Sequence, residues 1–358
     1  MEQKAWNAKR VGMVLLALVM AASALLFATG CSSQSNQKES SDPITMVWLP
    51  DNSSADLTQS REAIGDVIKE ATGRDVELMT TTDYNVAIEA ISSGSAQMAL
   101  LGAEGYVQAN SKNGAVQAAF TNSDENGTLD GACYYSRICV PADQAANYKD
   151  GDGYSLDSLK GKKFSFVSAT STSGFKVPSS AIMKKCGVES SDDLLQDGAF
   201  FGKVMFGDSH QGSAVNLLSG QSDAAAFDDV DVDMYLDLVS GTANTPGAVY
   251  KVKDDAAAPF DSVCGKEFTI IGITPVLNAP FCYNTDKLSD DEQKKITEAF
   301  CSEETASNKE IFADPDDENA KAIFEKDSDK TCFVACDDAW YNPSASWVHK
   351  AWSNVRNC

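Results

Sequence analysis

Positive charge is scarce in this 358-residue sequence, which has 29 lysines and arginines against 52 aspartates and glutamates. The formal net charge is −23 at pH 7. A protein that binds nucleic acid or anionic lipid by electrostatics needs a positive surface, so the composition excludes both kinds of partner. The sequence also lacks a G-x-S-x-G elbow, the usual local signature of one large class of serine hydrolases.

A long apolar run occurs at the N-terminus, from Val11 to Phe27. Three basic residues precede it, and small residues leading to Cys31 follow it. This layout predicts a signal peptide over residues 1–30 and lipidation of Cys31, with a transmembrane helix as the alternative. The polar segment 31–43 is expected to be a flexible tether. We therefore expect a protein on the extracytoplasmic face of the bacterial cell membrane, held there by lipid rather than by charge.

Ten cysteines are present, and removing Cys31 for lipidation leaves nine. In an exported chain some of these are expected to form disulfides, with at least one thiol left over. The closest pair, Cys332 and Cys336, is a weak zinc signal without a second pair of ligands. We expect no metal and no cofactor.

Apolar residues after position 44 alternate between strand-like and helix-like spacing. The expected order of strand, helix, strand, helix and strand falls at 44–50, 57–71, 76–80, 83–91 and 98–101. Gly73 and Gly94 end the two helices, and Asp83 caps the second. This order is typical of a parallel sheet with helices on its faces.

The same rhythm restarts after Ser158. The expected strands and helices lie, in order, at 164–167, 172–185, 204–206, 209–218 and 224–227. Two stretches rich in β-forming residues, 132–140 and 268–276, bracket this second unit and are long enough to cross between two lobes. Ser289 and Glu292 form a capping box that opens a mostly helical C-terminal part.

About 315 residues follow the tether, more than one hydrophobic core usually holds. We therefore expect a two-lobed α/β protein in which each lobe is a mainly parallel sheet flanked by helices. Lobe 1 would comprise residues 44–137 and 276–358, and lobe 2 residues 138–275, joined by two crossover hinge strands. A fold of this kind binds its ligand in the cleft between the lobes.

The sharpest local feature is a run of hydroxyl residues between the strand at 164–167 and the following helix. Backbone N–H groups and the positive end of the dipole make a helix start a ready site for a tetrahedral anion. One hydroxyl would suffice to cap the helix, which is the alternative interpretation. The run Thr170, Ser171, Thr172 and Ser173 exceeds that need, and Gly174 would let a ligand approach closely.

Two other helix starts, at Asp83-Tyr84 and Ser209-His210, also follow strands and so lie at a carboxyl edge. Tyr84 and His210 are therefore candidates for the same ligand, although an ordinary half-buried tyrosine and a capping histidine are the alternatives. The other histidine, His349, is expected to be solvated.

Acidic residues follow the strand at 224–227. Asp228 and Asp229 could contact the ligand, with a solvated helix-starting run as the alternative. Only Arg137, of five arginines, is a candidate for the cleft, so recognition of an oxyanion would rest on neutral donors.

These motifs together resemble one family. STSGFKVP after a strand, Ser-His at the next helix start, TDY at an early helix start, SGQSDAAAF and TPVLNAPF occur in the order found in the phosphonate-, phosphite- and phosphate-binding proteins of ABC importers. The resemblance runs from about residue 44 to 300 and implies a periplasmic-binding-protein fold of type II. It implies that Ser171, Thr172 and Ser173 grip the phosphorus-bound oxygens, and that Tyr84 and His210 contact the same head group.

The sequence departs from the family pattern in two places. An aromatic residue before Gly is common at the end of the third strand, whereas this chain has Leu101 before Gly102, and Tyr106 could supply the missing hydroxyl. The TPVLNAPF segment offers no acid to hold a ligand amine, a role that Asp228, Asp229 or Asp231 could take.

The function expected from these observations is capture of phosphonate, phosphite or phosphate and its delivery to a membrane permease and its ATPase. Two alternatives remain. One is a lipoprotein that senses another small oxyanion, and the other is a secreted hydrolase using Ser171 or Ser173, His210 and Asp228.

Overall fold

The computed structural model describes residues 42–341, apart from 315–316 and 318–320. The predicted signal peptide, the lipidation site Cys31 and His349 lie outside the described residues, as does all but the end of the tether. No helix in the described part of the chain is both long and apolar enough to cross a membrane.

The first sheet has six strands and is assembled from both ends of the described chain. In spatial order they are β17 (Phe333–Ala335), β4 (Val116–Asn122), β14 (Phe281–Asn284), β3 (Met98–Leu100), β1 (Ile44–Trp48) and β2 (Val76–Thr80). Strand β1 pairs in parallel with β2 and β3, as predicted, whereas β14 and β17 are antiparallel to their neighbours.

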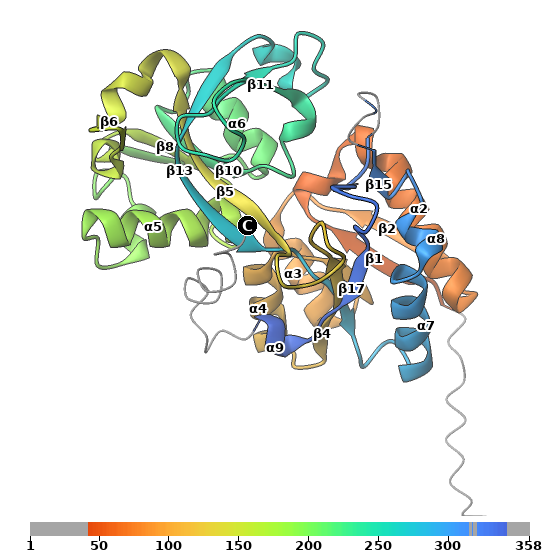
Figure 1. Ribbon diagram of the computed structural model, residues 1–358. Coiled ribbons are helices and arrows are strands. Elements are labelled where there is room, and N and C mark those ends of the chain that lie inside the picture. Colours follow the sequence, from red (N-terminus) through yellow and green to blue (C-terminus); the bar gives the residue numbers. More distant parts are fainter. Residues whose placement is uncertain (1–41, 315–316, 318–320, 342–358) are drawn as a thin grey trace, which may run out of the picture. The chain divides into compact units, whose positions relative to one another are not determined.

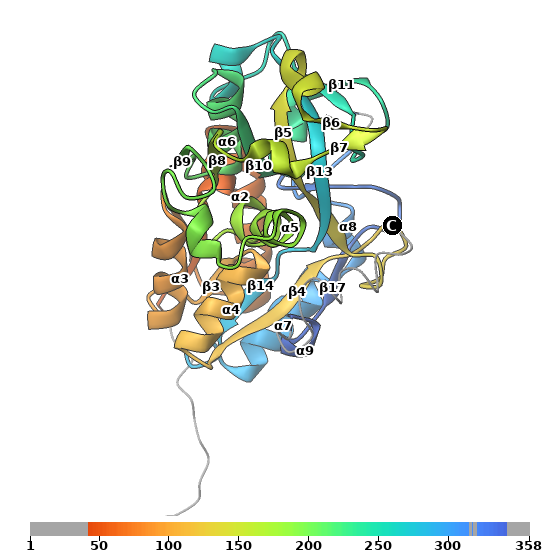
Figure 2. The ribbon, with the colours of Figure 1, turned by 90° about the vertical axis from the view of Figure 1, so that its left-hand side faces the viewer.

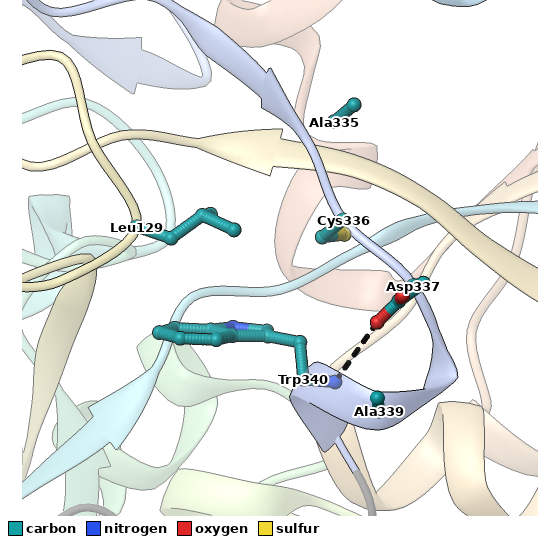
Figure 3. A pocket seen from close by; sticks show the side chains of 6 residues that line it. All are labelled: Leu129, Ala335, Cys336, Asp337, Ala339 and Trp340. Carbon is teal, nitrogen blue, oxygen red and sulfur yellow. Dashed lines mark hydrogen bonds between the residues drawn. The ribbon is translucent and has the colours of Figure 1, made fainter.

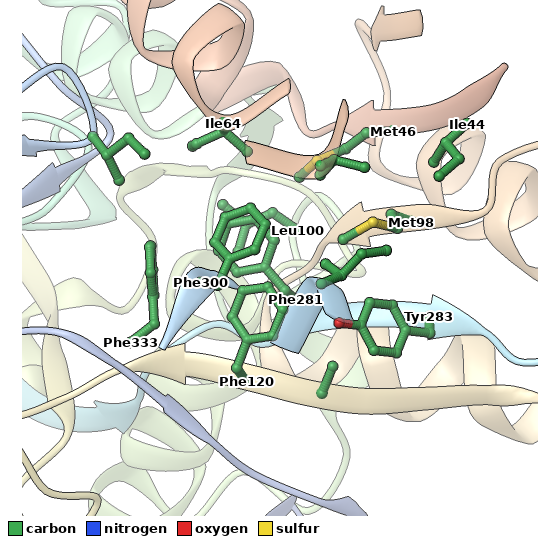
Figure 4. Close-up of a cluster of buried hydrophobic side chains, with 14 of the residues drawn as sticks. Ile44, Met46, Ile64, Met98, Leu100, Phe120, Phe281, Tyr283, Phe300 and Phe333 are labelled. Atoms are coloured by element: carbon green, nitrogen blue, oxygen red, sulfur yellow. The ribbon is translucent and has the colours of Figure 1, made fainter. Parts of the chain in front are cut away.

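Helices cover both faces of this sheet. They are α2 (Thr58–Thr72), α3 (Tyr84–Ser93), α4 (Ala103–Lys112), α7 (Asp290–Phe300), α8 (Glu303–Ala306) and α9 (Asp338–Tyr341). Side chains of α2 and α7 pack with β1 residues on one face, around the aromatic cluster of Phe120, Phe281 and Phe300 (Figure 4). Helices α3 and α4 lie on the other face, where Ile88, Ala109 and Val47 share a second core (Figure 2).

The predicted helix boundaries follow from their caps. The Asp83 carboxylate accepts a hydrogen bond from the Asn85 N–H, Gly94 ends α3 in the left-handed region, and Ser289 and Glu292 form the complete capping box of α7. The prediction of a mostly helical C-terminal part is wrong beyond α8. Short strands occur there because aromatic residues pack into the first core: β15 (Phe312–Ala313), β16 (Phe324–Glu325) and β17.

The second sheet has seven strands, all from the middle of the chain. In spatial order they are β11 (Leu236–Ser240), β12 (Val249–Val252), β13 (Glu267–Leu277), β5 (Cys133–Pro141), β10 (Ala224–Asp228), β8 (Lys163–Phe166) and β9 (Lys203–Phe206). Strands β8, β9 and β10 are parallel, as predicted, and the others are antiparallel. A separate hairpin joins β6 (Lys149–Asp150) and β7 (Gly153–Tyr154).

Helices α5 (Val177–Cys186) and α6 (His210–Leu218) cover opposite faces of this sheet, since Ile182 and Leu217 belong to separate cores. A π-helical turn, η5 (Thr172–Lys176), precedes α5, so the predicted helix 172–185 begins with a wider turn.

The two predicted crossings are the strands β5 and β13. They pair antiparallel from Cys133 opposite Leu277 to Pro141 opposite Phe268 (Figure 1). Strand β4 precedes β5 and β14 follows β13, so both chain passages between the two sheets lie side by side. Two sheets flanked by helices confirm the predicted α/β fold class. The expectation that each sheet is mainly parallel is wrong, because most strand pairings in both sheets are antiparallel. The predicted lobe boundaries fall inside β5 and β13.

Candidate ligand site

The hydroxyl run lies where β8 gives way to the π-helical turn. Ser171, Thr172 and Ser173 are 1%, 5% and 1% exposed, so none of them faces bulk solvent. The Ser171 Oγ accepts a hydrogen bond from the Gly174 N–H at 3.0 Å and thereby caps the turn. One hydroxyl thus caps the helix, as the alternative interpretation required, and two more lie beside it.

Gly174 is needed for packing against the preceding strand. A Cβ at this position would lie 2.3 Å from the Val167 Cβ and 2.8 Å from the Ser171 Oγ. The expected reason for this glycine was close approach of a ligand. The structure gives a different one, because the strand end leaves no room for a side chain.

Strand β5 contacts Ser173 through two residues that the sequence analysis did not single out. The Tyr134 hydroxyl donates to the Ser173 Oγ at 3.1 Å, and the Ser136 hydroxyl donates to the Ser173 carbonyl oxygen at 2.6 Å. Tyr134 and Ser136 are two positions apart, so they point to the same face of the strand. Hydroxyl residues two positions apart on a predicted crossing strand were the signal available in the sequence.

His210 lies at the start of α6 and is 2% exposed. Its Nδ1 accepts a hydrogen bond from the Asp228 N–H at 2.9 Å, which assigns the ring proton to Nε2. Nε2 lies 3.3 Å from the Ser173 Oγ and 3.5 Å from the Ser171 Oγ. The structure therefore brings His210 together with the hydroxyl run, with an N–H donor directed at it.

Asp228, which was also predicted to contact the ligand, lies beside Ser173 and His210. Its Oδ2 accepts the Ser173 hydroxyl at 3.1 Å and lies 3.2 Å from His210 Nε2, while its Oδ1 accepts the Asp231 N–H at 3.1 Å. Burial raises the pKa of Asp228 well above its usual range, and the neighbouring carboxylates Asp229 and Asp51 raise it further. Asp228 therefore retains a proton to higher pH than an ordinary aspartate.

The molecule has two halves, one built on the six-stranded sheet and one on the seven-stranded sheet. Asp51, which the sequence analysis did not single out, connects them. It follows β1 and is 2% exposed. Its Oδ2 accepts a hydrogen bond from the Tyr84 hydroxyl, and its Oδ1 accepts the His210 N–H at 2.6 Å. Burial and the Asp51 charge raise the pKa of Tyr84 well above its usual range, so this hydroxyl stays a donor. Asp51 and the proline before it follow a parallel strand. A position directly after a strand is the criterion that selected Tyr84 and His210 in the sequence, so Asp51 met it as well.

Thr172 makes a second contact between the halves. Gly102 is the N-cap residue of α4 and has no side chain to cap it, so the Thr172 Oγ1 accepts the Glu104 N–H at 2.8 Å instead. A Cβ on Gly102 would lie 2.8 Å from that oxygen. Lys176 adds an ion pair to Glu104 at 3.2 Å. Thr172 thus belongs to the hydroxyl run in the second half but caps α4, a helix that packs on the sheet of the first half.

Asp229 is placed differently from Asp228. Its Oδ1 accepts the Tyr135 N–H at 2.8 Å and its Oδ2 accepts the Asn244 side-chain amide at 2.9 Å. Both oxygens of Asp229 therefore stabilise the loop after β10. Contact between Asp229 and a ligand stays a prediction.

The suggestion that Arg137 lies in the cleft is wrong. Its guanidinium donates to both Asp233 oxygens, at 2.5 and 2.7 Å, and lies 4.7 Å from the centre of the Tyr250 ring. Arg137 is 0% exposed, lies within the second sheet and stabilises the loop after β10 by pairing with Asp233.

Tyr106 is not brought together with the other candidates. It is fully buried in the core between α3 and α4, its ring centre lies 5.5 Å from that of Tyr341, and its hydroxyl donates to Asp338 at 3.0 Å. Tyr106 lies one helical turn after Gly102, and its side chain points into the core of the first half. A ligand contact from Tyr106 stays a prediction that this geometry does not favour.

The family model for periplasmic phosphonate substrate-binding proteins of ABC transporters matches residues 46–341. The chain belongs to this family. A curated relative, the phosphate-import protein PhnD of Mycolicibacterium smegmatis, is 28% identical over 217 residues. That match covers 58% of the chain and 64%, less than two thirds, of the relative.

Solved structures of phosphonate-binding proteins share the fold. A binding protein component of an ABC phosphonate transporter from Pseudomonas aeruginosa has a TM-score of 0.60 at 17% identity, covering 89% of this chain and 90% of its own. PhnD1 of Prochlorococcus marinus, in complex with methylphosphonate, has a TM-score of 0.58 at 14% identity, covering 88% of this chain and 100% of its own.

The described residues that could hold a metal ion are Asp51, His210 and Asp231, whose ligand atoms lie within 4.8 Å of one another. The hydrogen bond from the Asp228 N–H occupies His210 Nδ1 and leaves the proton on Nε2. A metal needs an unprotonated ring nitrogen, so the imidazole is not available as a ligand in this arrangement.

Cysteine supplies no metal site in the described chain either. Strand β17 separates Cys332 from Cys336, and consecutive strand residues rise about 3.3 Å each. Seven cysteines are free thiols and take part in no disulfide: Cys139, Cys186, Cys264, Cys282, Cys301, Cys332 and Cys336.

A separate open pocket of about 480 Å³ lies at the end of the described chain (Figure 3). Its lining comes from the loop before β5 and from the stretch that runs from the end of β17 into α9: Leu129, Ala335, Cys336, Asp337, Ala339 and Trp340. None of the predicted ligand residues lines it.

Proposed function

We propose that this chain is the extracytoplasmic solute-binding lipoprotein of an ABC importer. It captures phosphonate, phosphite or phosphate between its two halves and delivers it to a membrane permease driven by an ATPase. The observation that carries the proposal is the convergence of uncharged donors, the Ser171 and Ser173 hydroxyls and the His210 Nε2–H, where two buried helix starts meet. Each hydrogen bond to a charged oxygen is worth about 1.5–3 kcal/mol, so a few such donors hold an oxyanion without arginine or lysine.

The relatives support this class of ligand. The curated relative is named as a phosphate importer, and one structural neighbour holds methylphosphonate. A two-lobed binder of this kind closes over its ligand and docks in the closed form. A sensing lipoprotein would bind the same ligand but report to a receptor, and a permease and ATPase encoded beside the chain would favour import.

The geometry argues against a hydrolase. A Ser-His-Asp triad needs a free Nε2 lone pair facing the serine and a carboxylate on the Nδ1 side. Here Nδ1 faces a backbone N–H, and the Asp228 carboxylate lies on the Nε2 side. His210 therefore donates to Ser173 rather than accepting its proton.

Membrane attachment through lipidated Cys31 is part of the proposal. Cells expressing the full chain should incorporate labelled fatty acid into it, and Cys31→Ala should abolish the incorporation. Incorporation that persists in the variant would contradict the anchor.

A thermal-shift panel of phosphate, phosphite, methylphosphonate, aminoethylphosphonate and sulfate tests ligand capture. A ligand at about 100 times its Kd stabilises the folded state by about 2.7 kcal/mol, so at least one phosphorus oxyanion should raise the Tm by several degrees. Ser171→Ala should reduce that shift, and Ser180→Ala, at an exposed position of α5, should not. No shift with any phosphorus oxyanion would overturn the proposal.

A further inference from the structure

Three carboxyl groups meet around one imidazole at the ligand site. Asp51 comes from the loop after β1, and Asp228 and Asp231 come from the end of β10 and the loop after it. The ligand atoms of Asp51, His210 and Asp231 lie within 4.8 Å of one another, and His210 Nε2 lies 3.2 Å from Asp228 Oδ2. Asp51 and Asp228 are each 2% exposed and Asp231 is partly buried.

No lysine or arginine in the described part of the chain pairs with this cluster. Within the described residues, the hydrogen-bonding partners of the three carboxyl groups are hydroxyl, amide and imidazole groups, and none is a lysine or an arginine. Arg137 is engaged by Asp233 and Asn244. Like charges at this separation in a buried site cannot all be ionised, because they repel strongly where water is excluded.

Asp228 and Asp231 are the members of the cluster that are best placed to share a proton, since the Asp231 N–H also donates to Asp228 Oδ1 at 3.1 Å. Their carboxyl groups are within hydrogen-bonding reach of each other. Burial raises the pKa of Asp231 well above its usual range, and the charges of Asp228 and Asp51 add to the shift. The Asp51 carboxylate is engaged elsewhere, because it accepts hydrogen bonds from the Tyr84 hydroxyl and from the N-terminal N–H of α6.

The titratable and charged groups that face the pair come from every element packed around it. They are Asp51 after β1, Tyr84 of α3, Tyr134 of β5, His210 of α6 and Asp229 after β10. Tyr84 and Tyr134 stay neutral because burial raises the pKa of each well above its usual range. The carboxyl groups therefore govern how the site responds to pH.

We propose that the Asp228–Asp231 carboxyl pair, with Asp51 beside it, is the specificity determinant of the site. The pair admits an oxyanion together with a proton that ligand and carboxyl share, and it rejects anions that are too weakly basic to share one. This inference rests on the proposed function, because it concerns the same site. Phosphonate, phosphite and phosphate oxygens are basic enough to hold a proton near neutral pH, whereas a sulfate oxygen of the same shape is not.

The inference predicts proton uptake on binding. An anion placed beside the pair raises its proton affinity further, so the complex holds more protons than the separate partners and affinity falls as pH rises. Calorimetric titration of methylphosphonate at about pH 8, in two buffers of different ionisation enthalpy, counts these protons. We expect uptake on the order of one proton per ligand and no measurable binding of sulfate.

Asp231→Asn keeps the shape of the side chain but removes the shared proton. We expect proton uptake to fall by at least about half and the preference for methylphosphonate over sulfate to fall at least about tenfold. Asp255→Asn changes the net charge equally at an exposed position and should alter neither quantity.

Binding of methylphosphonate by the wild-type protein without proton uptake would overturn the inference and leave the proposed function standing. So would an unchanged preference in Asp231→Asn. If the variant does not fold, the proton count of the wild-type protein still decides. Failure of the wild-type protein to bind any phosphorus oxyanion would overturn the proposed function and the inference together.

Discussion

Gly102→Ala would place a methyl group at the contact between the two halves. The new Cβ would lie 2.8 Å from the Thr172 Oγ1 and 3.7 Å from the Thr172 Cβ. Gly102 has φ −61° and ψ 159°, an extended conformation that alanine adopts without strain. The conflict is therefore with Thr172 of the other sheet and not with the local backbone.

The cost can be estimated from the crowding. Inserting a methyl group into a packed contact costs about 1–3 kcal/mol. Thr172 cannot simply rotate away, because it is buried and its Oγ1 accepts the Glu104 N–H that starts α4. If capture requires the halves to meet, the cost appears in binding as a roughly 5- to 150-fold weaker affinity. The free energy of unfolding should change by less than about 1 kcal/mol, the cost of alanine at a helix start.

Calorimetry with methylphosphonate on four proteins separates this effect from loss of a ligand contact. The set is the wild type, Gly102→Ala, Thr172→Ala and the double variant, which form a double-mutant cycle. Without the Thr172 Oγ1 the clash is absent, so Gly102→Ala should have little further effect in that background. Gly114→Ala is the matched control, because a Cβ there meets no atom within 4 Å. Equal losses in both backgrounds, or an unchanged affinity, would refute the reasoning.

Three other changes test the surrounding structure. Gly174→Ala should destabilise the fold by about 3 kcal/mol in urea unfolding, the upper end for an added methyl group, because its Cβ would lie 2.3 Å from the Val167 Cβ; near-wild-type stability would contradict the packing. Asp233→Ala should cost about 3 kcal/mol, the low end for a buried pair, because Arg137 is fully buried but the Asp233 side chain is 37% exposed; an unchanged Tm would contradict a structural role. The folded protein retains a proton on Asp231 that the unfolded chain releases above its ordinary pKa, so wild-type stability falls as pH rises through the raised value. Asp231→Asn should therefore stabilise the protein without ligand more at about pH 8 than at about pH 5, and calorimetric scans showing the reverse order would count against a raised pKa.

Local patterns predicted most of the elements because local interactions set their boundaries. Strand β2 has the predicted bounds, and Asp83, Gly94 and Ser289 act as the predicted caps. The segment after α8 was mispredicted because its structure depends on distant partners. Phe333 takes part in a strand only because β4 is beside it and the first core receives its ring.

The residues of the candidate ligand site divide in the same way, into those that local patterns predict and those that only the fold reveals. Ser171, Ser173 and His210 follow strands and open helices, so their convergence could be predicted from the carboxyl-edge rule. Asp51 fits that rule equally well, yet only the fold shows that its carboxylate reaches the first N–H of α6 in the other half. Arg137 illustrates the opposite error, since nothing local reveals that its guanidinium turns toward Asp233.

The central claim is that uncharged donors at two adjoining helix starts, Ser173 and His210 above all, hold a phosphorus oxyanion. The most direct test is the equilibrium Kd of Ser173→Ala for the anion that gives the largest thermal shift in the wild-type protein. This change removes the hydroxyl shared by Tyr134, Asp228 and His210, and the account predicts at least about tenfold weaker binding with a preserved fold. An affinity equal to that of the wild type, in a variant with an unaltered circular dichroism spectrum, would contradict the account.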